Sequence, residues 1–313
     1  MLRRLLLPAW IALTGLCVIA PTLRAEVTVE KSEQGAVIKA DGQPFAEYVV
    51  ESGGKPIVWP ILGPTGKPMT RAYPMREDVA SEKHDHPHHR SLWFTHGDVN
   101  GLSFWDKATT RHREFVKLES GKHGLVVTRN DWIDREGKTV LEDERRLVFG
   151  ADASSRWIDF DITLTARGGP VTFGDTKEGS FGVRVAETMK VDAKLGGRIV
   201  DSKGRENQDA WGKQAEWVDY YGPVDGETLG IAIMNHPTSF RFPTFWHVRT
   251  YGLFAANPFG IRDFTGSKEN DGSYKLSEGK SITFRYRVLF HKGDVKQGRV
   301  AENFTAYSAQ SPD

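Results

Sequence analysis

Apolar and polar residues alternate along much of the chain in short runs. The clearest run covers residues 156–166, where Ile158, Phe160 and Ile162 alternate with side chains that are mostly polar. A period of two is typical of a β-strand with one buried face. The same reading predicts further strands over residues 27–31, 36–40, 44–50, 55–62, 113–118, 124–133, 139–148, 181–187, 215–221, 229–235, 247–254 and 281–290.

Turn signals separate these runs. Asp41-Gly42 and Asp225-Gly226 each stand between two expected strands, a pattern typical of tight hairpins. Three prolines and two glycines within residues 63–75 predict a long surface loop. Many short strands with frequent glycine turns favour a sandwich or barrel over alternating strands and helices.

One helix is expected near the C-terminus. Val300, Phe304 and Tyr307 recur there at helical spacing, and Asp294 is expected to cap the helix. We therefore expect a mainly β protein in which residues 26–313 form a single domain, a large antiparallel β-sandwich with few short helices.

The first 25 residues have the layout of a secretory signal peptide. Arg3 and Arg4 precede an apolar stretch over residues 5–20, and Ala25 offers a small residue at the cleavage position. A membrane anchor needs roughly 20 unbroken apolar residues, whereas this stretch is shorter and contains Pro8. We expect cleavage after Ala25 and a periplasmic or secreted protein.

Loss of that segment limits the chemistry of the mature chain. It removes three arginines and no acidic residue, so the formal net charge changes from +1 to −2, which provides no basic field for nucleic acid. The single cysteine, Cys17, is also removed, which excludes disulfides and thiolate chemistry. The chain has no phosphate-binding glycine loop, no dinucleotide fingerprint and no Gly-x-Ser-x-Gly elbow. No later segment is long and apolar enough to span a bilayer.

Candidate chemistry gathers in residues 84–101. Five of the ten histidines fall there within 13 residues, namely His84, His86, His88, His89 and His96. Histidine titrates near neutral pH and is the commonest metal ligand. The segment runs into the apolar Leu92-Trp93-Phe94, and Asp98 and Asn100 follow on a tight turn. Three interpretations stay open: a solvated polar loop, a divalent metal site, or an acid/base site without metal.

A second candidate segment lies in residues 245–260. If residues 247–254 form one strand, His247, Arg249 and Tyr251 share a face that is suited to a ligand. The alternative is a set of structural residues that pair with the backbone. Asn257, which precedes a proline, is primarily a turn signal.

A third segment covers residues 175–187. Glu178 stands at the entry to an expected strand, and Arg184 lies within that strand beside apolar neighbours. A single Glu–Arg pair of this kind is either functional or structural.

These three segments together resemble a known family. The residues that carry the resemblance are 85–94 (DHPHHRSLWF), 96–101 (HGDVNG), 104–105 (FW), 178–184 (EGSFGVR) and 247–260 (HVRTYGLFAANPFG). The pattern is similar to that of the exported bacterial proteins called methane oxygenase PmoA. A methane monooxygenase subunit is held in a membrane, and no span is expected after residue 25, so the resemblance implies an exported β protein rather than methane oxidation.

The resemblance also implies a link to carbohydrates, because this family occurs in bacteria rich in exported carbohydrate-processing proteins. Trp93, Trp105, Trp246 and Tyr251 lie near arginine, aspartate, asparagine and histidine residues, which agrees with a sugar ligand. The residue types are similar to those of β-sandwich mutarotases and polysaccharide lyases, in which His, Glu, Arg and Tyr move protons on a sugar.

We therefore expect an exported carbohydrate-active enzyme of the lyase, epimerase or hydrolase type, with a sugar or oxidised sugar as ligand. The residues expected to act as acids, bases or carboxylate partners are His88, His89, His247, Glu178 and Asp98. Those expected to bind the sugar are Arg90, Trp93, Asn100, Trp105, Arg184, Arg249, Tyr251 and Asn257. If a divalent transition metal assists, its expected ligands are His86, His88, His89 and His96. The alternatives are a non-catalytic carbohydrate-binding protein and a metal-dependent oxidase.

Overall fold

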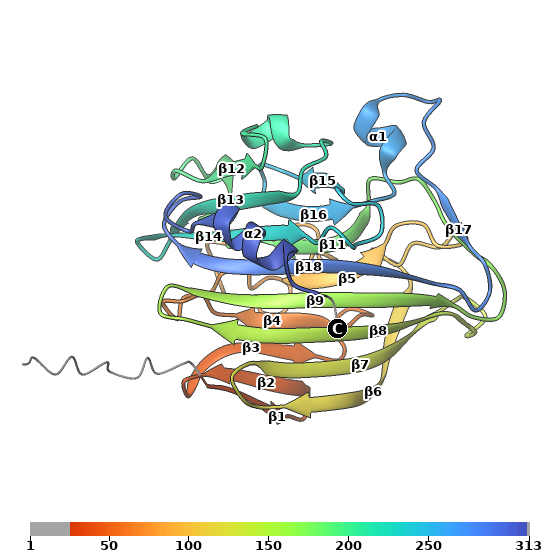
Figure 1. Ribbon diagram of the computed structural model, residues 1–313, viewed down its shortest axis with the longest axis horizontal. Helices are drawn as coiled ribbons and strands as arrows, with labels where there is room; N and C mark the ends of the chain where they lie inside the picture. The colour runs from red at the N-terminus through yellow and green to blue at the C-terminus, as the bar shows by residue number, and fades with distance from the viewer. Residues whose placement is uncertain (1–25, 312–313) are drawn as a thin grey trace, which may run out of the picture.

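A computed structural model describes residues 26–311 and shows two large antiparallel sheets packed face to face (Figure 1). The first sheet has the strand order β1 (Val27–Lys31), β2 (Gly35–Ala40), β3 (Gln43–Val49), β4 (Ile57–Ile61), β5 (Leu92–His96), β11 (Gly179–Arg184), β16 (Leu253–Asn257), β15 (Phe245–Val248). The second has the order β12 (Arg198–Asp201), β13 (Trp217–Val224), β14 (Glu227–Asn235), β18 (Ser281–Lys292), β9 (Ser155–Ala166), β8 (Thr139–Ala151), β7 (Gly124–Ile133), β6 (Thr109–Glu119). A small third sheet pairs β10 (Val171–Phe173) with β17 (Tyr274–Leu276).

Helices are few and short in this range. They are α1 (Ile261–Thr265), α2 (Val300–Ser308) and the 3-10 helices Val191–Ala193 and Asn207–Ala210. The expected mainly β sandwich with few short helices is confirmed, and α2 is the expected C-terminal helix. Asp294 caps the turn before α2 rather than the helix itself, because its carboxylate accepts from the backbone N–H groups of Lys296 and Gln297. No helix among residues 26–311 has the length and apolar character needed to cross a bilayer.

The core lies between the two sheets, and it consists of every second side chain along each strand. On β9, Ile158, Phe160 and Ile162 point inward and are at most 2% exposed. Phe160 meets Phe181 of β11 at a ring-centroid distance of 4.9 Å, which joins the two sheets directly. The intervening side chains on each strand must then point to the outer faces. The outer faces of the two sheets are therefore the places where polar chemistry can gather. The expected signal peptide, residues 1–25, lies outside the described residues.

The sequence pattern was wrong about residues 247–254, which do not form one strand. The chain forms β15, turns, and returns as the antiparallel neighbour β16. Gly252 allows this turn because its φ of 99° is a conformation that side chains disfavour. His247 therefore lies on β15, while Arg249 and Tyr251 lie on the turn, so the three residues do not share a strand face.

Residues 63–75 also differ from the expected surface loop. Thr70 pairs with Val185 as an isolated bridge, and Met69 and Arg71 are fully buried. The prolines and glycines mark turns correctly, but the side chains between them pack into the protein. Arg71 consequently reaches the outer face of the first sheet.

His96 belongs to the core and lies apart from the other histidines of its segment. Its Nε2 is 2.9 Å from the Gly174 carbonyl oxygen, and its Nδ1 is 3.2 Å from the Ser180 hydroxyl oxygen. Its ring packs against Phe173 and Phe259. Both nitrogens have hydrogen-bond partners, so the structure does not bring His96 together with the other expected metal ligands, His86, His88 and His89. Burial lowers the pKa of His96 to about 4.

Two residues of β8, Asp143 and Arg145, form a fully buried ion pair. The Asp143 carboxylate accepts from Arg145 at 2.9 and 3.0 Å and from the indole N–H of Trp132 at 2.7 Å. Asn130 donates to the same carboxylate at 2.6 Å. Every lone pair of the carboxylate therefore has a donor nearby, which makes the burial of this charge tolerable.

Replacement of Asp143 by alanine should cost about 3–5 kcal/mol of unfolding free energy, because it leaves the Arg145 guanidinium buried without a counter-charge. Urea unfolding followed by tryptophan fluorescence measures this loss. The control is Glu144→Ala, which removes an exposed pair with Arg129 on the same two strands and should leave the urea midpoint nearly unchanged. Equal midpoints for the two variants would contradict the assignment.

His96 should make stability depend on pH. Above pH 6.5 both the folded and the unfolded chain carry a neutral His96, whereas between pH 6.5 and 4 only the unfolded chain takes up the proton. Stability should therefore fall as the pH falls through this window. His96→Gln should reduce the loss between pH 7 and pH 5 by about 2 kcal/mol. Urea titrations at both pH values measure this, and an unchanged loss in the variant would refute it.

Candidate functional site

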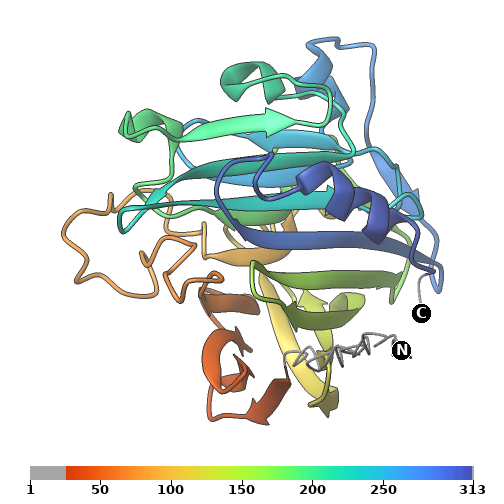
Figure 2. The same ribbon diagram turned by 60° about the vertical axis from the view of Figure 1, so that its left-hand side comes forward.

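The outer face of the first sheet carries an apolar floor that is separate from the sandwich core. Trp93 of β5 and Leu253 of β16 point to this side, whereas their neighbours Phe94 and Phe254 point to the core. Val49, Ile57, Trp105 and Ala255 complete the buried patch with them. The loop that carries the histidines, residues 84–91, extends over this floor from the segment drawn in orange at the left of Figure 2.

Four rings form a continuous stack on this floor. Tyr251 stacks on His86 at 5.3 Å between centroids, His86 stacks on His89 at 4.8 Å, and His89 stacks on Trp93 at 5.5 Å. The edge of His89 also meets Trp105. Trp93 and His89 are only 1% exposed, whereas the His86 side chain is 41% exposed. The stack therefore runs from the buried floor to an accessible end at His86 and Tyr251.

Asp85 ties the histidine loop to the sheet. Its carboxylate accepts from Arg71 at 2.5 Å and from Arg184 of β11 at 3.1 Å, and Arg71 also donates to its backbone carbonyl at 2.7 Å. Although burial alone would raise the pKa of Asp85, these two guanidinium groups lower it below its usual value. Burial lowers the pKa of Arg184 to about 10, so Arg184 keeps its charge near neutral pH.

The buried Lys55 side chain links the histidine loop to the segment that carries Trp105. Its Nζ donates to the backbone carbonyls of Trp105 at 2.7 Å and His88 at 3.1 Å. Burial lowers the pKa of Lys55 to about 7. Burial, with a contribution from Lys55, likewise lowers the pKa of His88 to about 4, and burial lowers that of His89 further. Both histidines are therefore neutral at neutral pH.

His247 and Glu178 lie beside this stack. The Nδ1–H of His247 donates to the Lys177 carbonyl at 2.7 Å, which leaves Nε2 with a lone pair. Burial lowers the pKa of His247 to about 4, so its ring is neutral at neutral pH. Burial raises the pKa of the Glu178 carboxyl. Lys177 and Asp263 act electrostatically on both groups, which places the two side chains in one neighbourhood.

Tyr251 connects the two parts of the site. Burial raises the pKa of its hydroxyl, and the charges that act on it come from Arg184, Arg249, Glu178 and Asp85. The guanidinium carbons of Arg184 and Arg249 lie 5.0 and 5.7 Å from its ring centroid. Tyr251 therefore stands between the histidine loop and the Glu178 carboxyl as a protonated hydroxyl.

Several buried polar atoms on this face have no hydrogen-bond partner among residues 26–311. They are Trp93 Nε1, Thr95 Oγ1, Trp105 Nε1, Arg184 Nη1, His89 Nδ1 and Trp211 Nε1. Folded proteins pair nearly all buried polar atoms with protein or bound groups. Most of these atoms are donors, so their concentration here favours a ligand rich in oxygen acceptors.

The side chains of three predicted site residues form hydrogen bonds with backbone groups. Asp98 accepts from the Gly101 N–H, and Asn100 accepts from the Thr172 N–H, which places both on a turn beside β10. Asn257 is fully buried, and both ends of its side-chain amide are hydrogen-bonded to backbone. The amide donates to the Thr176 carbonyl and accepts from the N–H groups of Phe259 and Gly260. The structure thus gives these three residues structural contacts outside the ring stack.

Arg90 points to a neighbouring cavity rather than into the stack. Its Nη1 donates to the Ser52 hydroxyl at 2.8 Å. The cavity has a volume of about 430 Å³ and is lined by Trp59, Met75 and parts of β3 and β4. The structure therefore separates Arg90 from the histidines that stand next to it in the sequence.

No group of three or more His, Cys, Asp or Glu side chains in the described part of the chain is arranged to hold a metal ion. The rings of His86 and His89 lie parallel within 6°, so their nitrogens do not converge. His96 is occupied in the core. The residues present do not fit the expected metal centre.

Sequence reasoning missed Lys55, Arg71 and Trp211. Lys55 appeared only as the first residue of an expected strand, and Arg71 as part of a surface loop. Neither position has a local pattern that distinguishes it from an exposed cation, since its role depends on contacts with residues 12 to 50 positions away. Trp211 contacts Arg249 through its ring face, and no spacing links these residues in the sequence.

Some solved structures are similar to this one, at low identity. A GH36 α-galactosidase from Geobacillus stearothermophilus matches with a TM-score of 0.43 and 11% identity, covering 86% of this chain and 42% of its own. A heparan sulfate lyase from Pedobacter heparinus gives 0.37 and 9%, with 87% and 37% covered. A galactose mutarotase related enzyme from Lactobacillus acidophilus gives 0.32 and 11%, with 85% and 95% covered. The chain thus spans less than half of the first two proteins.

No curated protein matches the sequence. A sequence family does match, over residues 35–305, and it is described as a family of unknown function. The match does not carry the methane oxygenase name that the motifs suggested. Because it covers most of the chain, this protein belongs to the family of unknown function DUF6807.

Proposed function

We propose that this protein is an exported enzyme that binds a sugar or oxidised sugar on the outer face of the first sheet and transfers protons to and from it. The observation that carries the proposal has two parts: a neutral imidazole, His247, and a carboxyl of raised pKa, Glu178, lie on either side of the Lys177 carbonyl, and the Glu178 charge acts on Tyr251 at the accessible end of the ring stack. Export rests on the signal-peptide pattern of residues 1–25.

The ring stack supports binding of a sugar. Tyr251 and His86 form the accessible end of the stack, and Tyr251, its outermost ring, offers an aromatic surface for the C–H side of a pyranose ring. The unpartnered Nη1 of Arg184, whose guanidinium lies 5.0 Å from the Tyr251 ring centroid, supplies a donor for sugar oxygens. Ligand sites typically combine an aromatic lining with a few convergent polar groups in this way.

The protonation states support proton transfer. His247 Nε2 and the Glu178 carboxylate can each accept a proton, whereas the Tyr251 hydroxyl holds one that it can donate. If the base removes a proton from a ring carbon next to a carbonyl or carboxyl group, the electron pair moves onto that oxygen. The Arg184 guanidinium and the Tyr251 hydroxyl are the donors positioned to stabilise the resulting negative charge.

Reaction classes that begin with this step include epimerisation and β-elimination, and protonation of a glycosidic oxygen by the same groups would serve hydrolysis. A non-catalytic carbohydrate-binding protein would use the ring stack and the donors alone. It would have no need for a neutral imidazole beside a carboxyl of raised pKa, which is why we favour an enzyme.

Glu178→Gln and His247→Gln should each lower turnover by about 100-fold or more, because each removes a proton acceptor but keeps the size of the side chain. Proton NMR in D₂O, with a panel of neutral sugars, keto-sugars, aldonic acids and uronic acids, detects both solvent exchange at carbon and product formation. Glu114→Gln on the outer strand β6 serves as the matched control and should retain the wild-type rate.

Two outcomes would overturn the enzyme assignment. One is a wild-type rate in both Glu178→Gln and His247→Gln on a substrate that the native protein converts. The other is a panel sugar that binds to the native protein, loses affinity in Tyr251→Ala, and undergoes neither exchange nor conversion. The second result would identify a binding protein that uses the same face.

A further inference from the structure

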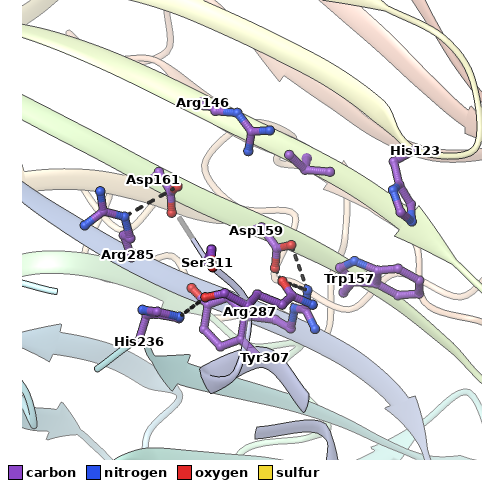
Figure 3. A pocket seen from close by; sticks show the side chains of 12 residues that line it. His123, Arg146, Trp157, Asp159, Asp161, His236, Arg285, Arg287, Tyr307 and Ser311 are labelled. Atoms are coloured by element: carbon purple, nitrogen blue, oxygen red, sulfur yellow. Dashed lines mark hydrogen bonds and ion pairs between the residues drawn. The ribbon is translucent and has the colours of Figure 1, made fainter. Parts of the chain in front are cut away.

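A second cavity lies on the opposite side of the molecule, on the outer face of the second sheet. Its volume is about 340 Å³, and its floor is formed by β8, β9 and β18. Tyr307 of α2 and the residues after this helix, Gln310 and Ser311, complete its wall (Figure 3). A volume of this order is at the lower end for small-molecule sites, which begin at about 300 Å³.

The floor of this cavity consists of three cross-strand rows. The first row is Arg146–Asp161–Arg285, the second is Val148–Asp159–Arg287, and the third places Trp157 next to Gly150. Side chains that are paired in register stand side by side on one face of a sheet. Figure 3 shows the result, with Trp157 and His123 at one end of the cavity and Asp161, Arg285 and His236 at the other.

The aromatic end is built as a platform. The Trp157 indole lies flat over Gly150, since a Cβ at position 150 would stand 2.1 Å from its Cζ2 atom. Only a glycine leaves room for this arrangement. One ring face therefore rests on the sheet, and the half-buried indole lines the cavity.

The other end presents donors. Between the two ends, Arg287 donates two hydrogen bonds to Asp159, at 2.5 and 2.7 Å, and its guanidinium carbon lies 5.7 Å from the Trp157 ring centroid. Arg285 Nε and the Tyr307 hydroxyl are buried and have no hydrogen-bond partner among residues 26–311. Arg285 Nε is 3.8 Å from Asp161, which is too long for a hydrogen bond. Tyr307 is only 4% exposed, and burial raises its pKa, so its hydroxyl stays protonated and can donate.

The charges around the cavity are not balanced. Three guanidinium groups, on Arg146, Arg285 and Arg287, face two carboxylates, on Asp159 and Asp161. Burial lowers the pKa of His123 and of His236, so these rings are neutral at neutral pH. The lining therefore carries more positive than negative charge, and guanidinium groups prefer carboxylates and other oxyanions.

We propose that this cavity is a second saccharide-binding site, specific for an acidic sugar of the uronate class. The sugar ring would lie on Trp157, and its carboxylate would accept from Arg285 Nε–H and the Tyr307 hydroxyl. The site is on the opposite sheet from Glu178 and His247, so it binds without converting, and it does not depend on the function proposed above.

The test is calorimetric titration of the chain from residue 26 onward with digalacturonate, beside the neutral disaccharide α-1,4-galactobiose. We expect digalacturonate to bind at least tenfold more tightly than the neutral sugar. Trp157→Ala should weaken binding of the acid at least tenfold, because it removes the platform. Tyr307→Phe should weaken it by about tenfold, because it keeps the packing of α2 but removes one donor to a charged acceptor.

Glu114→Gln, on β6 and outside both sites, is the control and should leave the affinity for digalacturonate unchanged. The proposal is overturned if digalacturonate does not bind at millimolar concentration, or if the neutral disaccharide binds as tightly. It is also overturned if His247→Gln weakens binding while Tyr307→Phe, a variant that retains the fold, does not. That last pattern would place the acid on the first sheet and leave the function proposed there intact.

Discussion

The outer face of the first sheet depends on one carboxylate held between two buried guanidinium groups. Arg71 and Arg184 are at most 1% exposed, and their like charges would repel each other without a counter-ion. Asp85 accepts hydrogen bonds from both, which makes their burial tolerable. Because Asp85 belongs to the histidine loop, the same contacts also fix His86 in the ring stack. The ion pairs of Asp85 with Arg71 and Arg184 thus position the histidine loop, residues 84–91, on the first sheet.

Two guanidinium groups, on Arg71 and Arg184, share the single negative charge of Asp85. The excess positive charge faces the proposed substrate. Arg184 keeps an unpartnered Nη1 after Asp85 has used its Nη2. A buried donor without a partner gains most from an acceptor that carries negative charge. An oxygen that becomes negative when a proton is removed from the neighbouring carbon is such an acceptor. The group that secures the loop is therefore also suited to stabilise the charge that the proposed reaction develops.

The sequence pattern was sufficient for the sandwich but only partly for the site. A strand with one solvent-facing side, such as β9, can be predicted because its apolar and polar residues alternate. Residues 124–133 form β7 as expected. β5 is buried on both sides, so its pattern does not alternate and no strand was predicted there. The hairpin of β15 and β16 was read as one strand because apolar residues continue through its turn.

Sequence alone also did not distinguish the candidate residues that lie in the site from those that have structural contacts. Histidines that lie close together in the sequence look equivalent. Yet His89 lies in the ring stack on the outer face of the first sheet, whereas His96, seven residues later on β5, points into the core. Asn257 has the composition of a ligand residue, but its amide closes a loop. Residue type predicts which groups can do chemistry. Only the pairing of strands decides whether such a group faces solvent, the core or its own backbone.

Both proposed sites use the same means to place an indole on a sheet. Trp93 lies over Gly182 and Trp157 lies over Gly150, and a Cβ at either glycine would meet the ring at under 3 Å. In the first sheet the histidine loop covers the indole, so that it becomes the base of a ring stack. In the second sheet no ring stacks on it in the described range, and it lines a cavity instead. Because the strand geometry is alike, the two proposed sites differ in the element that lies above each indole.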